Sequence, residues 1–272
     1  MPLINEQVSL LSNVNVGPKI WLMRLEAPAL ASVLLPGQFV HMKIPGMDDH
    51  ILRRPFSIYA WNREEGWIDI LYQVVGYGSN HMTTLDPSTL SANAPIELIG
   101  PIGKRWTSTN PDLAIRKALL VGGGVGAPPL FMLASEMKAA GIEVDVVLGA
   151  ATKDALVCKD RFEEMLGFEP ACATDDGTYG RAGFCTSLVV EKLDAATDAG
   201  CPYDYVATCG PTPLMKIVAD AAAAHDAYCE VSMEKRMACG VGACLSCVVD
   251  TDEGKQRACV DGPIFAATKV VW

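Results

Sequence analysis

The chain has 272 residues, half of them apolar and a fifth charged, which is the composition of a folded globular protein long enough for two domains. Its formal net charge of -10 argues against a nucleic-acid partner, because phosphate binding needs an excess of Lys and Arg. A chain of this length buries roughly three quarters of its unfolded surface, so its stability does not require disulfides.

The N-terminus has no basic segment followed by an apolar run, so we expect no signal peptide. The most apolar stretch, residues 118–134, contains four Gly and two Pro, which makes a membrane span a poor interpretation. The ten cysteines gather towards the C-terminus instead of forming the framework of a short secreted chain. We therefore expect a cytoplasmic protein without a membrane partner.

Residues 1–110 contain short β-rich runs, such as residues 38–44, 53–60 and 67–76, separated by Gly, Pro and Asn. Their spacing of about ten residues predicts an antiparallel barrel domain. From Lys117 the pattern changes to apolar strand, turn and helix, repeated along the chain. This alternation predicts a Rossmann-like α/β domain with a doubly wound parallel sheet over residues 111–228.

Residues 229–272 are rich in Cys and Gly and predict a small separate domain. Cys239, Cys244 and Cys247 follow the pattern C-x4-C-x2-C, and Cys259 comes after eleven intervening residues. This is the spacing of plant-type [2Fe-2S] ligation. Four thiolates must converge on two irons while the loop amides hydrogen-bond the sulfurs, and small residues in the loop permit that approach.

A structural zinc site is the alternative for these four cysteines, although zinc sites usually show two short cysteine pairs. Disulfides are a weaker alternative. The cysteines outside the spacing are interpreted as buried thiols: Cys158, Cys172, Cys185, Cys201 and Cys229.

A glycine loop follows the apolar strand that begins the second domain. Its glycines precede a helix with Pro in its first turn, and they are Gly122, Gly123, Gly124 and Gly126. Such a loop offers amide donors and a positive helix end to a pyrophosphate, although a tight turn without a ligand has the same pattern. Cys209, Gly210 and Pro211 end a later strand, where they could face a nicotinamide ring or simply terminate the strand.

The acid that usually binds the ribose of NAD is expected at the end of the second strand. Glu143 and Asp145 lie at the start or middle of that strand. Residues 150–160 contain Lys but no Arg for a 2′-phosphate, so NADH is only slightly favoured over NADPH.

NADH gives up electrons in pairs whereas an iron-sulfur cluster accepts them singly, so a chain with both sites needs a converter, and flavin is the usual one. The barrel contains suitable residues for FAD. Arg can neutralise a pyrophosphate, an aromatic ring can stack on the flavin and a hydroxyl can hydrogen-bond to it. The candidates are Arg54, Pro55, Phe56 and Ser57, then Leu71, Tyr72 and Gln73, and finally Gly78 and Ser79 at a short helix.

In this order, PGQFV at residues 36–40, RPFS at 54–57, GGGVGAPP at 122–129 and CGP at 209–211 resemble the ferredoxin reductase superfamily. The cluster loop and the RACVDGPIF that follows it resemble the electron-transfer subunit of B-type dihydroorotate dehydrogenase. The resemblance covers nearly the whole chain.

It implies FAD bound by the barrel residues named above, NAD as a substrate at the parallel sheet, and a [2Fe-2S] cluster on the four cysteines. It further implies a partner, the FMN-containing catalytic subunit, in a heterotetramer with two subunits of each kind. Electrons would pass between NADH and the dihydroorotate and orotate pair in pyrimidine (UMP) biosynthesis.

The sequence departs from the superfamily at two places. Phe56 replaces a common Tyr, and Lys104, Arg105 and Trp106 stand where small residues are expected. The four histidines occur in no catalytic motif, so we expect no catalytic side chain within this relay.

Two alternatives remain at this stage. One is the flavin and iron-sulfur subunit of a ferredoxin-dependent NAD(P)H oxidoreductase or sulfide dehydrogenase, which tends to replace one cysteine ligand with an acid. The other is a non-enzymatic redox sensor or zinc-stabilised binding module.

Overall fold

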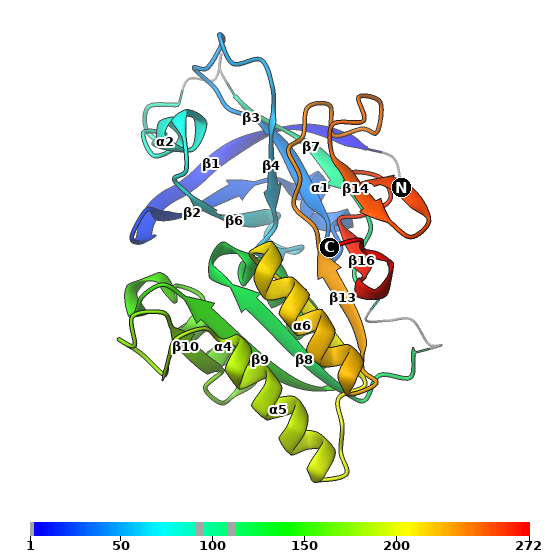
Figure 1. Ribbon diagram of the computed structural model, residues 1–272. Helices are drawn as coiled ribbons and strands as arrows, with labels where there is room; N and C mark the ends of the chain where they lie inside the picture. The colour runs from blue at the N-terminus through cyan, green and yellow to red at the C-terminus, as the bar shows by residue number, and fades with distance from the viewer. Residues whose placement is uncertain (1–2, 91–94, 108–112) are drawn as a thin grey trace. The chain divides into compact units, whose positions relative to one another are not determined.

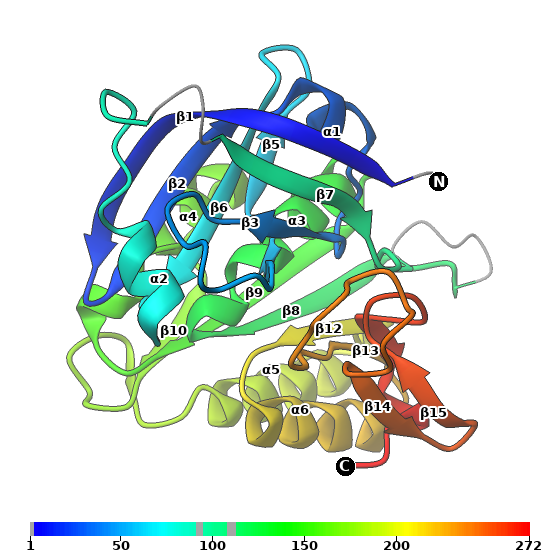
Figure 2. The same ribbon diagram turned by 90° about the horizontal axis from the view of Figure 1, so that it is seen from above.

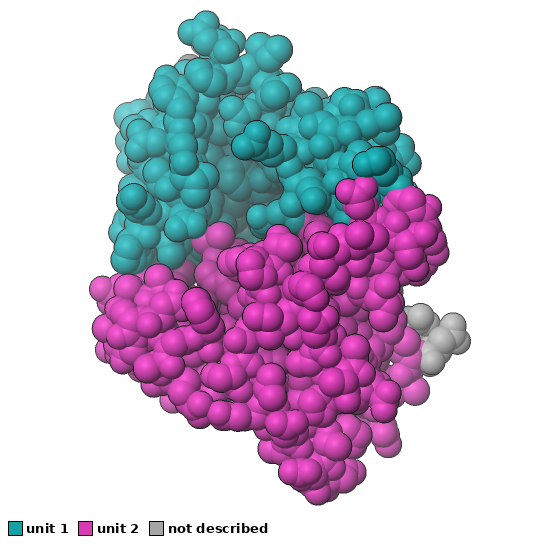
Figure 3. Space-filling model, viewed as in Figure 1, with its two compact units in different colours: residues 1–105, 234–249, 255–263 teal, residues 106–233, 250–254, 264–272 magenta. Residues whose placement is uncertain are grey.

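The structure is a computed structural model that describes residues 3–90, 95–107 and 113–272. The chain folds into two compact units (Figure 3). The first comprises Met1–Arg105, Glu234–Val249 and Lys255–Pro263, and the second comprises Trp106–Met233, Asp250–Gly254 and Ile264–Trp272. The predicted boundary between residues 110 and 111 lies outside the described residues. The division into three functional domains stays a prediction.

The first unit is built on a seven-stranded sheet in the order β4-β3-β7-β1-β2-β6-β5 (Figure 1). Neighbouring strands are antiparallel. The strands are β1 (Ile4–Gly17), β2 (Ile20–Glu26), β3 (Phe39–Lys43), β4 (Arg54–Ser57), β5 (Ala60–Asn62), β6 (Trp67–Gln73) and β7 (Ile96–Ile102), with helices α1 (Pro28–Val33) and α2 (Tyr77–Met82).

This sheet curls so that strands far apart in its order approach each other. The ring of Phe56 on β4 lies 6.2 Å from the ring of Tyr72 on β6, centre to centre and edge to face. Buried side chains such as Met23, Leu25 and Ile70 fill the inside of the curl. The predicted antiparallel barrel is therefore confirmed, in the form of a curled half-barrel.

One carboxylate is buried in the sheet and is neutralised there by its neighbour. Asp69 on β6 is fully buried, and Arg24 on β2 donates two hydrogen bonds to its two oxygens, at 2.7 and 2.9 Å. The guanidinium also lies 3.8 Å from the ring centre of Trp67. A buried charge needs such a partner, because leaving it unpaired costs several kcal/mol.

The second unit is built on a sheet in the order β11-β10-β9-β8-β12-β13-β16. Its strands are β8 (Lys117–Gly123), β9 (Glu143–Ala150), β10 (Ala171–Thr174), β11 (Arg181–Ala182), β12 (Tyr205–Cys209), β13 (Tyr228–Ser232) and β16 (Ile264–Ala266). All neighbouring pairs are parallel except β13 and β16. The predicted doubly wound parallel sheet is confirmed, and the antiparallel edge strand is an addition from the C-terminus.

The strand order reverses between β8 and β12, because the chain adds β9 and β10 on one side of β8 and then returns to place β12 on the other. The helices are α3 (Phe131–Ala139), α4 (Lys159–Leu166), α5 (Thr186–Asp198) and α6 (Thr212–Ala224). Figure 2 shows α3 and α4 on the opposite face of this sheet from α5 and α6. Ligands of doubly wound folds bind at the carboxyl ends of the strands at such a reversal.

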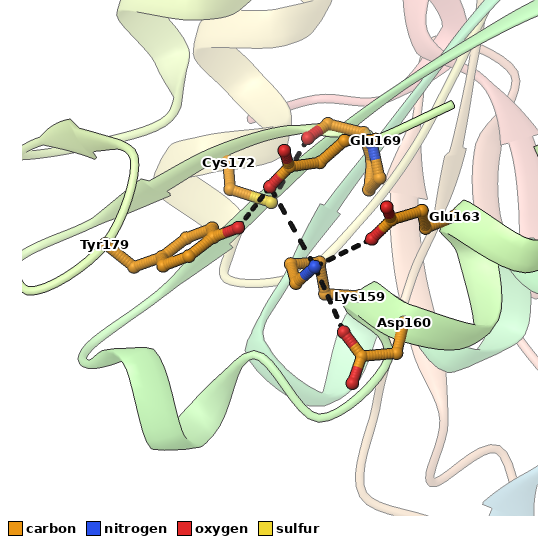
Figure 4. Close-up of polar contacts among 7 residues, drawn as sticks. Lys159, Asp160, Glu163, Glu169, Cys172 and Tyr179 are labelled. Atoms are coloured by element: carbon orange, nitrogen blue, oxygen red, sulfur yellow. Dashed lines mark hydrogen bonds and ion pairs between the residues drawn. The ribbon is translucent and has the colours of Figure 1, made fainter.

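A network of charges attaches α4 to the edge of this sheet (Figure 4). The ammonium of Lys159 lies 2.8 Å from Glu163, 3.0 Å from Asp160 and 3.9 Å from Glu169. The hydroxyl of Tyr179 donates to Glu169, which precedes β10. Hydrogen bonds to Glu163 and then Asp160 raise the pKa of Lys159. The ammonium of Lys159 thus connects α4 to Glu169, in the segment before β10.

The remaining strands are β14 (Val248–Thr251) and β15 (Gly254–Arg257), which form a two-stranded sheet near the C-terminus. Among the described residues, no helix is both long enough and apolar enough to cross a membrane.

We predict that Arg24→Leu lowers the free energy of unfolding by about 2 kcal/mol, because it leaves the carboxylate of Asp69 buried without its cation. Urea unfolding followed by circular dichroism measures this. Lys43→Met is the matched control, since Lys43 is an exposed partner of Glu97 and such pairs contribute at most about 1 kcal/mol. An equal loss in both variants would contradict the account of Asp69.

Candidate cluster and cofactor sites

The four predicted cluster ligands lie in the first unit, in a loop without regular secondary structure and in the turn after β15. Cys247 and Cys259 are buried, Cys239 is half-buried and Cys244 is exposed. The loop therefore places one side of the cysteine set at the surface and the other against the half-barrel unit.

Glycine is required in this loop by both backbone and space. Gly240 and Gly242 have φ angles of +70° and +83°, which favour residues without a Cβ. A Cβ on Gly240 would lie 2.6 Å from Nδ1 of His41, and one on Gly242 would lie 2.5 Å from Cγ2 of Val260. The loop therefore packs closer to its neighbours than any side chain at these positions would allow.

The cysteines lie as two neighbouring pairs. The Cys239 thiol interacts with Cys244, and the Cys259 thiol interacts with Cys247. Among the described residues, no three His, Cys, Asp or Glu side chains are gathered as ligands of a single metal ion. Two thiolates for each of two irons is the demand of a [2Fe-2S] cluster, and the two pairs fit it.

Loop amides point at the sulfur atoms. The amide of Val241 donates to Sγ of Cys239 at 3.4 Å. Burial raises the pKa of Cys239, but hydrogen bonds from the amide of Val241, from the thiol and amide of Cys244 and from the amide of Ala243 outweigh it and lower that pKa to about 6. Burial, followed by the neighbouring Cys247, raises the pKa of Cys259 to about 12. Amide donors to sulfur are what a thiolate-bound cluster needs to carry negative charge.

Arg257 joins the two halves of the cysteine set, a contact that the sequence analysis missed. Its Nη1 donates to the carbonyl of Gly242 at 3.1 Å, and its Nε donates to the carboxylate of Asp261, also at 3.1 Å. The amide of Ala258 donates to the carbonyl of Cys247 at 2.8 Å. These bonds fix the turn that carries Cys259 against the loop that carries the other three cysteines.

The predicted flavin residues come together in the same unit. Arg54, Pro55, Phe56 and Ser57 form β4, an edge strand that is half-buried along its length. Leu71, Tyr72 and Gln73 end β6, and Gly78 and Ser79 lie in α2.

Two contacts connect these segments. Phe56 meets Tyr72 as described, and a Cβ on Gly78 would lie 3.5 Å from Nε of Arg54. The hydroxyl of Ser79 accepts hydrogen bonds from the amides of Val75 and Gly76, at 2.9 and 3.2 Å. Ser79 therefore shapes the turn before α2, and the guanidinium of Arg54 lies beside the helix, where a pyrophosphate would find a cation. The FAD assignments of the individual residues stay predictions.

The glycine loop and the CGP segment lie against each other in the second unit, on the two strands where the order reverses. A Cβ on Gly126 would lie 2.4 Å from the carbonyl oxygen of Cys209 and 2.6 Å from the amide nitrogen of Gly210. Gly122 is paired in register with Cys209. The two segments predicted from separate motifs thus form one continuous surface at the carboxyl ends of β8 and β12.

The helix after the glycine loop begins later than predicted. Gly124–Gly126 and Pro128–Leu130 are two short 3-10 turns, and α3 begins at Phe131. The prolines therefore lie in the 3-10 turn before the α-helix and not in its own first turn. The prolines set the backbone for a helical turn but supply no amide donors, so the backbone donors at this end of β8 belong to the glycine segment.

Glu143 and Asp145, the acids considered as ribose ligands, do not lie at the end of β9. Glu143 is the first residue of β9, and Asp145 accepts hydrogen bonds from Tyr203 at 2.7 Å and Lys192 at 3.1 Å. The end of β9 instead meets two acids from the turn after β10. The amides of Asp175 and Asp176 donate to the carbonyls of Ala150 and Ala151. The sequence analysis missed these acids because they belong to the third strand and not the second.

Family comparisons agree with the FAD region and the cluster region predicted from the sequence. Residues 7–106 match the model of an oxidoreductase FAD-binding domain, and residues 234–271 match the iron-sulfur cluster binding domain of dihydroorotate dehydrogenase B.

A solved structure of an NADH-dependent reduced ferredoxin-NADP oxidoreductase, a flavin-based electron-bifurcating enzyme, is similar over 98% of this chain and 90% of that one, with a TM-score of 0.81 and 27% identity. The Amycolatopsis cytochrome P450 reductase GcoB has the same fold, with a TM-score of 0.63, 22% identity, and coverage of 82% of this chain and 67% of that one. The fold and the two domains thus define an oxidoreductase of the ferredoxin-reductase type that carries FAD and a [2Fe-2S] cluster.

Relatives that match over nearly their whole length identify the family within this class of oxidoreductases. The electron transfer subunit of dihydroorotate dehydrogenase B (NAD(+)) from Desulforamulus reducens is 37% identical over 94% of both chains. The subunit of the same name from Fusobacterium nucleatum is 34% identical, covering 97% of this chain and 98% of the relative. The chain belongs to the family of electron transfer subunits of dihydroorotate dehydrogenase B.

We predict that Cys244→Ser removes most of the cluster iron and leaves FAD bound, because the predicted flavin residues lie outside the cysteine loop. Iron analysis and the visible absorption spectrum of the purified protein measure both cofactors. Cys201→Ser is the control, since Cys201 lies outside the ligand spacing and is also exposed, which corrects its interpretation as a buried thiol. Joint loss of FAD and iron in the Cys244 variant would contradict separate binding sites.

We also predict that Gly126→Ala raises the KM for NADH roughly tenfold, because the added methyl group forces the glycine loop away from Cys209 and Gly210. FAD and cluster spectra are expected to stay unchanged. Gly200→Ala is the control for general backbone strain, since Gly200 has a positive φ angle but open space around it and lies outside the glycine loop. An unchanged KM for NADH in the Gly126 variant would remove the glycine loop from the nucleotide site.

Proposed function

We propose that this chain oxidises NADH and passes the electrons, through FAD and the [2Fe-2S] cluster, to the FMN-containing catalytic subunit of dihydroorotate dehydrogenase B. The pathway served is pyrimidine biosynthesis. One observation carries this proposal: strand β3 of the first unit contacts both β4, where flavin is predicted to bind, and the cysteine loop. Val40 pairs in register with Phe56 on β4, and the ring of the next residue, His41, lies against Gly240.

Each group of residues has a distinct task in this relay. The cation of Arg54 beside α2 suits the pyrophosphate of FAD, and the aromatic pair of Phe56 and Tyr72 suits a planar ring system. Bound FAD supplies the conversion from electron pairs to single electrons. The loop amides around Cys239 keep negative charge on the sulfurs.

NADH is the proposed donor, bound where the glycine loop meets Cys209 and Gly210. Amides of the glycine segment would hold the pyrophosphate. The amides of Asp175 and Asp176 donate to the end of β9, which places acids on the edge where a ribose is recognised in such folds. The carboxylate of Asp176 already accepts hydrogen bonds from the amide and hydroxyl of Thr178, so Asp175 is the proposed ribose ligand. Carboxylates there favour a free 2′-hydroxyl over a 2′-phosphate, which supports NADH over NADPH.

An electron transfer subunit implies a catalytic partner, and we propose that this partner carries FMN and assembles with this chain as two subunits of each kind. Support comes from the exposure of the cysteine loop. Cys244 is exposed, and the apolar side chains of Val241 and Leu245 beside it are 47% and 64% exposed. A cluster at an apolar surface can pass electrons to a docked protein. We further propose a cytoplasmic location, where such cysteines stay reduced.

The subunit of a ferredoxin-dependent NAD(P)H oxidoreductase is the second candidate, because the bifurcating enzyme described above shares nearly the whole fold. The four cysteine ligands favour the first proposal, since the alternative family tends to replace one of them with an acid. The full-length relatives named above point the same way.

We predict that the purified chain reduces artificial dyes with NADH but does not oxidise dihydroorotate. Addition of the dihydroorotate dehydrogenase catalytic subunit is expected to yield NAD-dependent dihydroorotate oxidation, and a mixture with reduced ferredoxin and NADP is the comparison. Orotate formation measures the first activity and NADPH formation the second. Dihydroorotate oxidation by this chain alone, or activity only with ferredoxin, would overturn the proposal.

A further inference from the structure

His41 is a buried histidine whose ring nitrogens lie beside the backbone of Arg53 and Cys239 without forming a hydrogen bond of good geometry. It lies on β3 and is 1% exposed, between the fully buried Val40 and Met42. Within the described residues, neither Nδ1 nor Nε2 has a partner that meets hydrogen-bond geometry. A buried polar group without a partner is rare in proteins, because its desolvation is not compensated. Such a group is retained where a ligand or a functional contact uses it.

One side of the ring faces the cluster loop. A Cβ on Gly240 would lie 2.6 Å from Nδ1 of His41, 3.2 Å from Cγ and 3.3 Å from Cε1. The ring therefore occupies the space that a side chain at position 240 would need, directly after the ligand Cys239. The positive φ angle of Gly240 turns the backbone away at this point. The imidazole is the surface on which this turn rests.

His41 lies on β3, which pairs with β4, the strand that contains predicted flavin residues. His41 is in register with Pro55, in the middle of β4, and Met42 is in register with Arg54. On its other side β3 pairs with β7, where His41 is in register with Ile99. The backbone of His41 is thus fixed in the middle of three strands, so the ring has a defined position relative to β4.

We propose that His41 is a positioning residue for electron transfer between the flavin and the cluster. Its ring fixes the Cys239–Gly240 turn at a set position relative to β4, and its Nδ1 faces the backbone of that turn on the cluster side. This inference rests on the proposed function, because it assumes FAD at β4 and a cluster on the four cysteines. The His41 side chain would thus set the rate of electron transfer between FAD and the cluster.

The first experiment separates shape from polarity in the intact FAD and iron-containing protein. His41→Phe keeps a planar ring without nitrogen, and His41→Asn keeps a polar group near the position of Nδ1. We expect both variants to retain FAD and iron. The Phe variant should show a changed electron paramagnetic resonance spectrum of the reduced cluster and a roughly tenfold slower reduction of the cluster by NADH-reduced flavin, with partial recovery in the Asn variant.

The readouts are iron and FAD content, the resonance spectrum, the cluster potential and the rate of cluster reduction in a single turnover. A Phe variant with unchanged spectrum, potential and rate would overturn the proposal. Equal loss of iron from both variants would also overturn it, because it would show a packing role alone. Wild-type protein that lacks either cofactor would instead refute the proposed function, so the two failures are distinguishable.

The second experiment tests the steric contact. Gly240→Ala is expected to lose cluster iron, and combination with His41→Ala is expected to restore part of it by making room for the methyl group. Gly242→Ala is the matched control, since Gly242 has a similar positive φ angle but its Cβ would meet Val260. His41→Ala should give no recovery there. Absence of recovery at Gly240, or equal recovery at both glycines, would overturn the role of His41.

Discussion

The physical constraint on this protein is the gathering of negatively charged sulfur in a folded interior. Four thiolates repel one another, and burial raises the free energy of each charged form. The chain meets this with backbone amides, such as that of Val241, which donates to Sγ of Cys239. Glycines at positive φ let the amides turn inward, and Arg257 with Asp261 fixes the last ligand to the others.

Glycine also has a structural role in the second unit, at the carboxyl ends of the parallel strands. At Gly126 the absence of a side chain allows two backbone segments to touch where the strand order reverses. In the cysteine loop it allows backbone to approach sulfur. In both places the proposed donors to a ligand are peptide groups, which are held rigidly because they belong to the main chain. Side-chain donors would lose conformational entropy on binding a charged ligand.

Much of this could be predicted from the sequence, because the signals are local. The spacing of Cys239, Cys244 and Cys247 falls within one loop, and the strand, glycine loop and helix after Lys117 are consecutive. The residues that were missed act across the chain. His41 meets Gly240 only because β3 and the cluster loop fold together, and the acids beside the end of β9 come from another strand. Periodicity and motifs carry no information on such pairings.

The C-terminal strand gives the cysteine segment an unusual place in the topology. Ser232, the last residue of β13, is in register with Ile264, the first residue of β16, and the two strands are antiparallel neighbours. The segment between them, residues 233–263, contains all four predicted cluster ligands and connects two strands that would otherwise form a β-hairpin. A two-residue turn could close that hairpin and leave the nucleotide sheet complete. The cluster segment is therefore an insertion between two neighbouring strands of the second sheet, and its cysteines fold into the first unit.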